Sequence, residues 1–142
     1  MLESNVWKKL YKYIRLHKPS GNWIIQRIET GGTVRGFPDV LFLEDGRAIF
    51  IELKVVKGNK VMLSPEQVNT LTTLARAGFA TWIVAYKQIK QDAAYFLGAG
   101  IYAEDIYEHG INSKHMHMFN PFDTLAVYDM LTTMGIVEEI EV

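Results

Sequence analysis

The sequence predicts an α/β fold in which helices flank a small mixed sheet. A stretch with apolar residues at helical spacing opens the chain, and three short runs rich in β-branched and aromatic residues follow it. A strong helix start then precedes a further apolar strand. The predicted order is helix, three strands, helix, strand, and a helix between two strands normally connects strands that run parallel.

The first four elements are predicted from periodicity and turn signals. A helix is expected over residues 2–17, where these apolar residues recur at helical spacing: Leu2, Val6, Leu10, Tyr13 and Ile14. Pro19 and Gly21 end it. Strands are expected at residues 23–28, 40–43 and 48–53. The Asp-Gly pair within residues 44–47 is a hairpin signal, so the three strands can form an antiparallel meander.

The second helix has the clearest start. Ser64 is a capping residue, Pro65 suits the first helical position, and Gln67 occupies the third, while Gly78 closes the helix. A strand is expected over residues 81–86. Further on, a helix is predicted over residues 93–97, and apolar residues recurring every three positions suggest a C-terminal helix with Phe122, Leu125, Tyr128, Leu131 and Met134. Residues 98–121 receive no assignment.

Length and composition limit the class of protein. The 142 residues are expected to form one domain, 1–142, with a core at about 3–86 and an unassigned extension at 87–142. Hydrophobic residues make up 49%, but no apolar run approaches the roughly 20 residues of a membrane span. The absence of cysteine excludes disulfides and thiolate chemistry. No secretory signal is visible, which fits a cytoplasmic protein.

The net charge of -1 hides an asymmetry. Residues 1–60 hold eleven Lys and Arg against six Asp and Glu, a net charge of +5, whereas residues 61–142 hold four against ten, a net of −6. Charge concentrated on one part of a protein can attract a polyanion when the total does not. The basic residues expected to contact DNA are Lys8, Lys12, Arg35, Lys57 and Lys60. The alternative is that these residues only solubilise the surface.

The residues that carry chemistry lie in the predicted hairpin. Side chains alternate along a strand, so Glu52 and Lys54 point to one side of the sheet and Leu53 to the other, into the core. Asp39 begins the partner strand and is brought beside Glu52. A Glu-x-Lys pair alone is usually a solvated face. Here a dense apolar context and the second carboxylate of Asp39 favour a functional cluster.

Two carboxylates brought together need a compensating charge, which a divalent cation supplies. A small set of oxygen ligands suits Mg²⁺ or Mn²⁺, with Asp39, Glu52 and the backbone carbonyl of Leu53 as ligands. The metal would activate water and a phosphate oxygen, and Lys54 would orient the water or stabilise the transition state. The sequence therefore predicts metal-dependent phosphodiester hydrolysis.

Two further residues each allow two interpretations. Glu3 shares a helix face with Trp7 and Leu10, and its carboxylate either favours the helix dipole or is an additional metal ligand. Gln67 either reaches the active site or serves only as the capping-box partner of Ser64. A zinc site of His109, His115 and His117 is not supported by their spacing.

The motifs resemble those of the VRR-NUC nucleases of the PD-(D/E)xK superfamily, alongside archaeal-type Holliday junction resolvases. The resemblance covers residues 3–86 and rests on Glu3, Gly-Phe-Pro-Asp at 36–39, Ile-Glu-Leu-Lys at 51–54 and Leu-Ser-Pro-Glu-Gln at 63–67. It implies a restriction-endonuclease-like αβββαβ core. It also implies that Asp39 and Glu52 bind the metal, that Lys54 serves the hydrolytic water, and that Glu3 and Gln67 are the family's first-helix acid and second-helix glutamine.

The resemblance implies a structure-selective endonuclease that acts on branched DNA such as Holliday junctions, in a bacterial or phage-infected cell and in DNA repair. Alternatives are a nuclease for flap or linear DNA and a DNA-binding module of the same fold that no longer cuts. Two symmetric cuts require two sites, so a homodimer is expected. Its surface would be the C-terminal apolar stripe, unless that stripe packs on its own sheet.

Overall fold

The computed structural model describes residues 7–8, 11–12, 15–16, 23–28, 35–44, 46–89 and 92–119. The predicted first helix is helical at its described positions, and Trp7 and Tyr11 pack against the core of the sheet. Glu3, the other undescribed parts of that helix and the predicted C-terminal helix lie outside the described residues. Within the described part of the chain, no helix is long and apolar enough to span a membrane.

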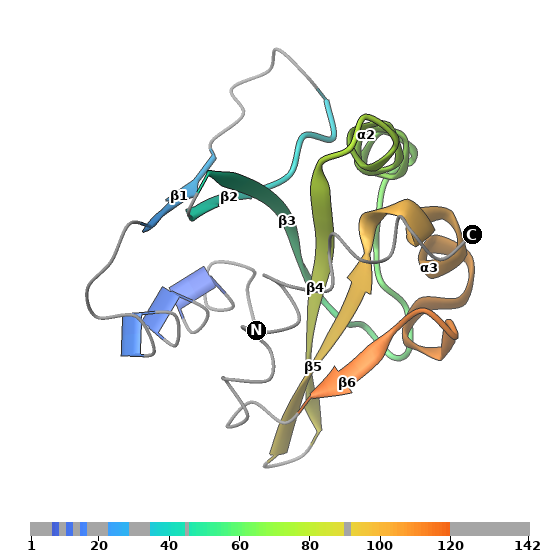
Figure 1. The fold of residues 1–142 in the computed structure, drawn as a ribbon. Helices are drawn as coiled ribbons and strands as arrows, with labels where there is room; N and C mark the ends of the chain where they lie inside the picture. Colours follow the sequence, from blue (N-terminus) through green and yellow to red (C-terminus); the bar gives the residue numbers. More distant parts are fainter. Residues whose placement is uncertain are drawn as a thin grey trace.

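Six strands form one mixed sheet in the order β1-β2-β3-β4-β5-β6 (Figure 1). The strands are β1 (Trp23–Arg27), β2 (Val40–Glu44), β3 (Arg47–Val55), β4 (Ala80–Ile89), β5 (Asp92–Ala99) and β6 (His117–Phe119). The first three strands form the predicted antiparallel meander, and β4 runs parallel to β3. The predicted α/β class and the helix, three-strand, helix, strand order are confirmed.

Helix α2 (Pro65–Arg76) makes the crossover between the two parallel strands. Its start is the predicted capping box: the Ser64 hydroxyl accepts from the Gln67 N–H at 3.1 Å, and the Gln67 side-chain oxygen accepts from the Ser64 N–H at 2.9 Å. These contacts satisfy two backbone donors that a helix start otherwise leaves without partners. Ala77 caps the other end, just before Gly78.

The helix predicted over residues 93–97 is wrong. Those residues belong to β5, which pairs antiparallel with β4 along its whole length. Tyr95 and Leu97 enter one core while Ala94 and Phe96 enter the other. A strand buried on both faces is apolar throughout, so its sequence lacks the alternation that identifies a strand with one exposed face.

The segment without a sequence assignment, residues 98–121, contains four short elements in its described part. They are η1 (Gly100–Tyr102), α3 (Ala103–His109), η2 (Gly110–Asn112) and β6. The sheet therefore continues well past residue 86, the last residue of the predicted αβββαβ core.

The sheet has a core on each face. One contains Ile51, Leu53, Trp82 and Val84, with Trp7 and Tyr11 packed against it. The other lies beneath α2 and α3 and contains residues of both helices together with Ile83 and Ala85 of β4. Figure 1 shows the first helical segment on the opposite side of the sheet from α2 and α3. The side of β3 that a residue faces therefore decides which helices it meets.

Candidate active site

Strand β3 places Glu52 and Lys54 on the face that α2 and α3 cover. The register pairs Glu52 with Ile83 and Lys54 with Ala85, and these β4 residues belong to the core beneath the helices. Leu53 faces the opposite core, as predicted. Glu52 has an exposed fraction of 0% and Lys54 of 9%, so both charged side chains are buried. Such burial is costly for charged groups and is unusual on a merely solvated strand.

Asp39 lies at the start of β2 and is fixed from two sides. Its backbone carbonyl accepts from the Ile28 N–H at 2.6 Å, and its carboxylate oxygen Oδ2 accepts from the Leu53 N–H at 3.1 Å. The register pairs Val40 with Ile51, so one residue earlier on β2 Asp39 lies opposite Glu52. The structure thus brings the Asp39 carboxylate to the segment of β3 that carries Glu52 and Lys54.

The backbone of Leu53 belongs to the same small region. In an extended strand the N–H and C=O of one residue point toward the same neighbouring strand. Because the Leu53 N–H points to Asp39, its carbonyl also points to the β2 side, beyond the first paired residue of β2, Val40. The role of the Leu53 carbonyl as a metal ligand stays a prediction.

The loop before Asp39 is docked on the first turn of α2. Gly36 has a φ of +79°, and a Cβ at this position would collide with the peptide that joins Glu66 and Gln67. The Thr70 hydroxyl also donates to the Arg35 carbonyl at 3.2 Å. A side chain at residue 36 would therefore push the loop, and Asp39 with it, away from the helix.

Gln67 occupies its capping-box position, so the structural role that the sequence allowed is present. Its side-chain oxygen is used by the Ser64 N–H. The backbone of the same turn of α2 contacts Gly36, three residues before Asp39, and Gln67 belongs to that turn. An amide group has donors as well as an acceptor, so the cap does not use up its hydrogen-bonding capacity.

An aromatic row missed by the sequence reasoning runs beside the site. Phe50, two residues before Glu52 on the same face of β3, makes edge-to-face contacts with Phe37 and with Phe79, each at 5.7 Å between ring centroids. These rings come from the loop before Asp39, from β3 and from the segment after α2. They hold the three segments together, and no short-range pattern in the sequence signals them.

The expected DNA-binding residues lie on three different segments of the chain. Lys8 and Lys12 are exposed on the helical segment whose Trp7 and Tyr11 pack on the Leu53 side of the sheet. Arg35 is exposed beside α2. Lys57 and Lys60 are exposed on a turn just after β3.

The three histidines considered for a zinc site each have a different environment. The His115 ring stacks on Tyr102 at 3.6 Å between ring centroids, and the His109 ring lies 3.5 Å from the Asp105 carboxylate. His117 is exposed on β6. Within the described ranges, no three His, Asp or Glu residues form a group that could hold a metal ion. The site of Asp39 and Glu52 thus offers two carboxylates, and Glu3 is outside the described residues.

Comparison with known proteins decides the family. The family model of the archaeal Holliday junction resolvases (Hjc) matches residues 11–118, which include the strands and helix that form the candidate site. The chain belongs to this Hjc family. The match extends through β5 and α3 into β6, so it reaches beyond residue 86, where the resemblance of the motifs ends.

Among solved structures, the chain is similar to Hjc of Archaeoglobus fulgidus, a Holliday junction resolvase from an archaeal hyperthermophile. The identity is 15%, the TM-score is 0.45, and the similarity covers 84% of this chain and 92% of that chain. No curated protein matches the chain by sequence. Membership of the Hjc family therefore rests on the family model.

Proposed function

We propose that this chain is a metal-dependent endonuclease that hydrolyses phosphodiester bonds in branched DNA, with four-way junctions as its preferred substrate. The observation that carries the proposal is the meeting of Asp39, Glu52 and Lys54 at one place on β2 and β3. Membership of the Hjc family supplies the substrate class. The closer resemblance to VRR-NUC nucleases, and action in DNA repair in the cytoplasm of a bacterial or phage-infected cell, are part of the proposal.

The donor set fits a hard divalent cation. Asp39 and Glu52 provide carboxylate oxygens, and the Leu53 carbonyl points to the same side as its N–H, which contacts Asp39. Oxygen ligands of this kind suit Mg²⁺ or Mn²⁺, with Glu3 as an additional ligand in the proposal. When bound, the cation offsets the negative charge of the carboxylates and polarises the phosphate. The N–H of Leu53 meanwhile fixes one oxygen of Asp39 and so limits the rotation of that carboxylate.

Lys54 supplies the positive charge of the protein itself. Its side chain is 9% exposed and shares a face with Glu52, so its ammonium group acts in a partly desolvated place where charge interactions are stronger than in water. We propose that it orients the attacking water or stabilises the charge that develops on the phosphate. Gln67, on the first turn of α2, is proposed to assist through its amide N–H groups while its oxygen keeps the cap.

The proposed DNA contacts are Arg35 beside α2, Lys57 and Lys60 on the turn after β3, and Lys8 and Lys12 on the first helical segment. Neutralising phosphates with Lys and Arg releases condensed counterions, so affinity should fall steeply with salt concentration. The working unit is proposed to be a homodimer, because two symmetric cuts in a junction require two sites in a fixed relation.

The test compares the wild type with Lys54→Ala and with Lys114→Ala, an exposed lysine before β6. Each protein is incubated with labelled four-way, flap and linear DNA in Mg²⁺, in Mn²⁺ and in EDTA. We expect Lys54→Ala to fold normally and to lose cleavage by at least about 100-fold, in the range of a lost charge-stabilising group. Lys114→Ala should cut as the wild type does.

The outcomes separate the alternatives. Full activity of Lys54→Ala, or full activity in EDTA, contradicts the mechanism. Equal cutting of linear and four-way DNA contradicts the substrate but leaves the nuclease activity in place. Binding of DNA without cutting in any metal would show a DNA-binding module that has lost its activity.

A further inference from the structure

The turn that follows β3 carries two facing lysines. Lys57 and Lys60 form an isolated antiparallel bridge with two backbone hydrogen bonds, 3.1 Å from the Lys57 N–H to the Lys60 carbonyl and 3.0 Å in the reverse direction. Both residues are exposed. Directly opposite residues in such a pair have Cβ atoms about 5 Å apart, and like charges in these positions repel. The turn therefore holds two positive charges close together at a cost in stability.

A third lysine reaches the same turn from β4. The Lys87 ammonium donates to the side-chain oxygen of Asn59 at 3.1 Å. Among the residues that the structure describes, none of Lys57, Lys60 and Lys87 has a carboxylate partner. Three cations gathered at one four-residue turn form a place where a bound anion would relieve the repulsion.

The turn of residues 57–60 is held in place by backbone contacts with η2. The carbonyl of Asn59 accepts from the Ile111 N–H at 2.9 Å. Gly110 lies against the same carbonyl so closely that a Cβ there would collide with it, and its φ of +60° also favours glycine. Backbone contact of this kind gives the turn a single position relative to α3.

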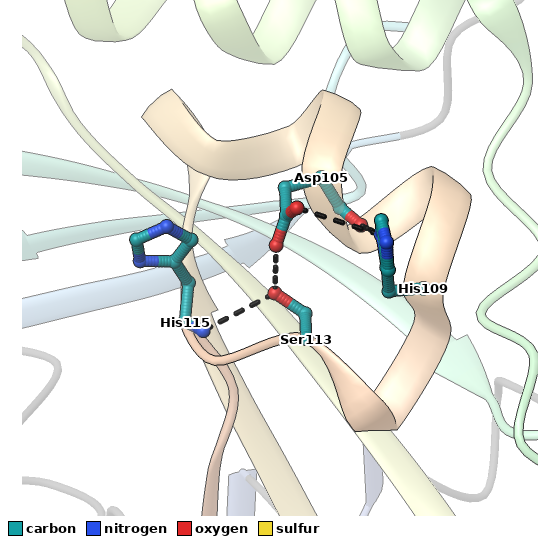
Figure 2. Close-up of polar contacts among 4 residues, drawn as sticks. All are labelled: Asp105, His109, Ser113 and His115. Atoms are coloured by element: carbon teal, nitrogen blue, oxygen red, sulfur yellow. Dashed lines mark hydrogen bonds and ion pairs between the residues drawn. The ribbon is translucent and has the colours of Figure 1, made fainter.

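The support under the turn is itself held by polar contacts (Figure 2). The Ser113 hydroxyl donates to the Asp105 carboxylate across η2, and it accepts from the His115 N–H at 3.1 Å. His109, one α-helical turn after Asp105, lies 3.5 Å from the same carboxylate. The hydrogen bond from Ser113 lowers the pKa of Asp105. The ionised carboxylate therefore keeps its contact with Ser113 across η2.

We infer that Lys57, Lys60 and Lys87 form a phosphate clamp that grips the DNA arm next to the scissile bond. The inference rests on the proposed nuclease function, because that function makes DNA the polyanion. Lys57 is three residues past Lys54 along the chain, about 10 Å in an extended strand. This equals roughly three base pairs of duplex rise. The clamp would thus bind the backbone within a few nucleotides of the cut and set the cut position.

The first test measures DNA binding in the Glu52→Gln background, where cleavage is blocked and no lysine is lost. Affinity for a labelled four-way junction is measured from low to high salt for Lys57→Gln/Lys60→Gln and for Lys8→Gln/Lys12→Gln, which removes the same charge. Each lost phosphate contact lowers the slope of log affinity against log salt by about 0.9. We expect a fall of nearly two for the turn variant, in addition to the fall that the helix variant shows through its own phosphate contacts.

The second test changes charge at the turn without removing a lysine. Asn59→Asp is nearly isosteric, keeps the backbone contacts and places a carboxylate beside Lys87. We expect it to raise the thermal midpoint at low salt, because it relieves the repulsion, and to weaken DNA binding by at least about tenfold, because it takes the place of the phosphate. Asn69→Asp, at an exposed position of α2, adds the same charge on an element other than the turn and its support, and should change both quantities little.

The results distinguish the clamp from the nuclease. An unchanged slope for the turn variant, or equal effects of Asn59→Asp and Asn69→Asp, would overturn the clamp even if the wild type cuts junctions. A wild type that cuts nothing, with the expected binding differences intact, would keep the clamp and overturn the proposed nuclease function.

Discussion

Single residues set the position of the Asp39 carboxylate. Its Oδ2 atom accepts from the Leu53 N–H, while the loop before it rests on α2 through Gly36. The Gly-Phe-Pro-Asp motif signals the importance of this segment in the sequence. The collision that excludes a side chain at residue 36 is a tertiary contact with a helix about 30 residues later, so no local pattern could predict it.

Gly36→Ala should destabilise the protein and reduce cleavage together. The variant combines a strained positive φ with a collision against the Glu66–Gln67 peptide, and we expect a loss of at least about 1–3 kcal/mol in the free energy of unfolding. Gly46→Ala is the matched control, because Gly46 has a similar φ of +78° but open space around it. Urea unfolding and junction cleavage measure both variants. Equal effects of the two substitutions on cleavage would show that the contact with α2 does not position Asp39.

The Asp105–Ser113 contact should appear as a pH dependence of stability. The pKa of Asp105 is lowered from 3.8 in the folded protein, so its contribution is fully present above 3.8 and is lost as the pH falls through the folded value. Ser113→Ala should raise the pKa of Asp105 toward 3.8 and destabilise the fold at pH 7. The difference from the wild type should shrink in acid, which NMR titration and thermal unfolding can follow. A difference that is constant from pH 7 to pH 2 would contradict this cause.

At the scale of elements, the helices and strands that could be predicted are those with a signal in neighbouring residues. Ser64, Pro65 and Gln67 predict the start of α2 because capping uses residues three apart, and β2 and β3 follow from an Asp-Gly turn. Strand β5 could not be predicted, because Ala93–Leu97 is apolar on both faces and its state depends on pairing with β4. The segments α3 and η2 are short and depend on contacts with the turn after β3.

Gln67→Glu separates the two roles of Gln67. Glutamate can keep the capping box with Ser64 but loses the amide N–H donors. We expect stability within about 0.5 kcal/mol of the wild type and clearly slower cleavage. Ser64→Ala is the opposite change, since it should cost about 1 kcal/mol and leave the chemistry of Gln67 intact. If Gln67→Glu cuts at the wild-type rate, Gln67 has only the structural role.

At the scale of the whole molecule, the distribution of charge along the chain can be predicted from the sequence, whereas the grouping of charges on one surface cannot. The basic first part carries Asp39, Glu52 and Lys54 as well as the lysines of the turn, whereas Lys87 joins them from the acidic part only through the fold. The sequence therefore predicted an electrostatic bias toward DNA, but it could not show which cations share one surface.

A homodimer should be detected by light scattering at micromolar concentration. The expected mass is twice the 16.2 kDa of the chain, because a junction needs two sites for two cuts. Trp7 and Tyr11 pack on the core of the sheet, so these two apolar side chains are not proposed to form the dimer interface. A monomer across this range that still cuts both strands of a junction symmetrically would contradict the proposed assembly.

The central claim is that Asp39, Glu52 and Lys54 form the active site of a junction-selective, metal-dependent nuclease. The most direct measurement is the single-turnover cleavage rate of a four-way junction against a linear duplex of the same sequence, for the wild type and Lys54→Ala, with Mg²⁺ and with EDTA. We predict rapid cutting of the junction by the wild type in Mg²⁺, little cutting of the duplex, and none in EDTA or by Lys54→Ala. Cutting of the junction by Lys54→Ala at the wild-type rate would contradict the account.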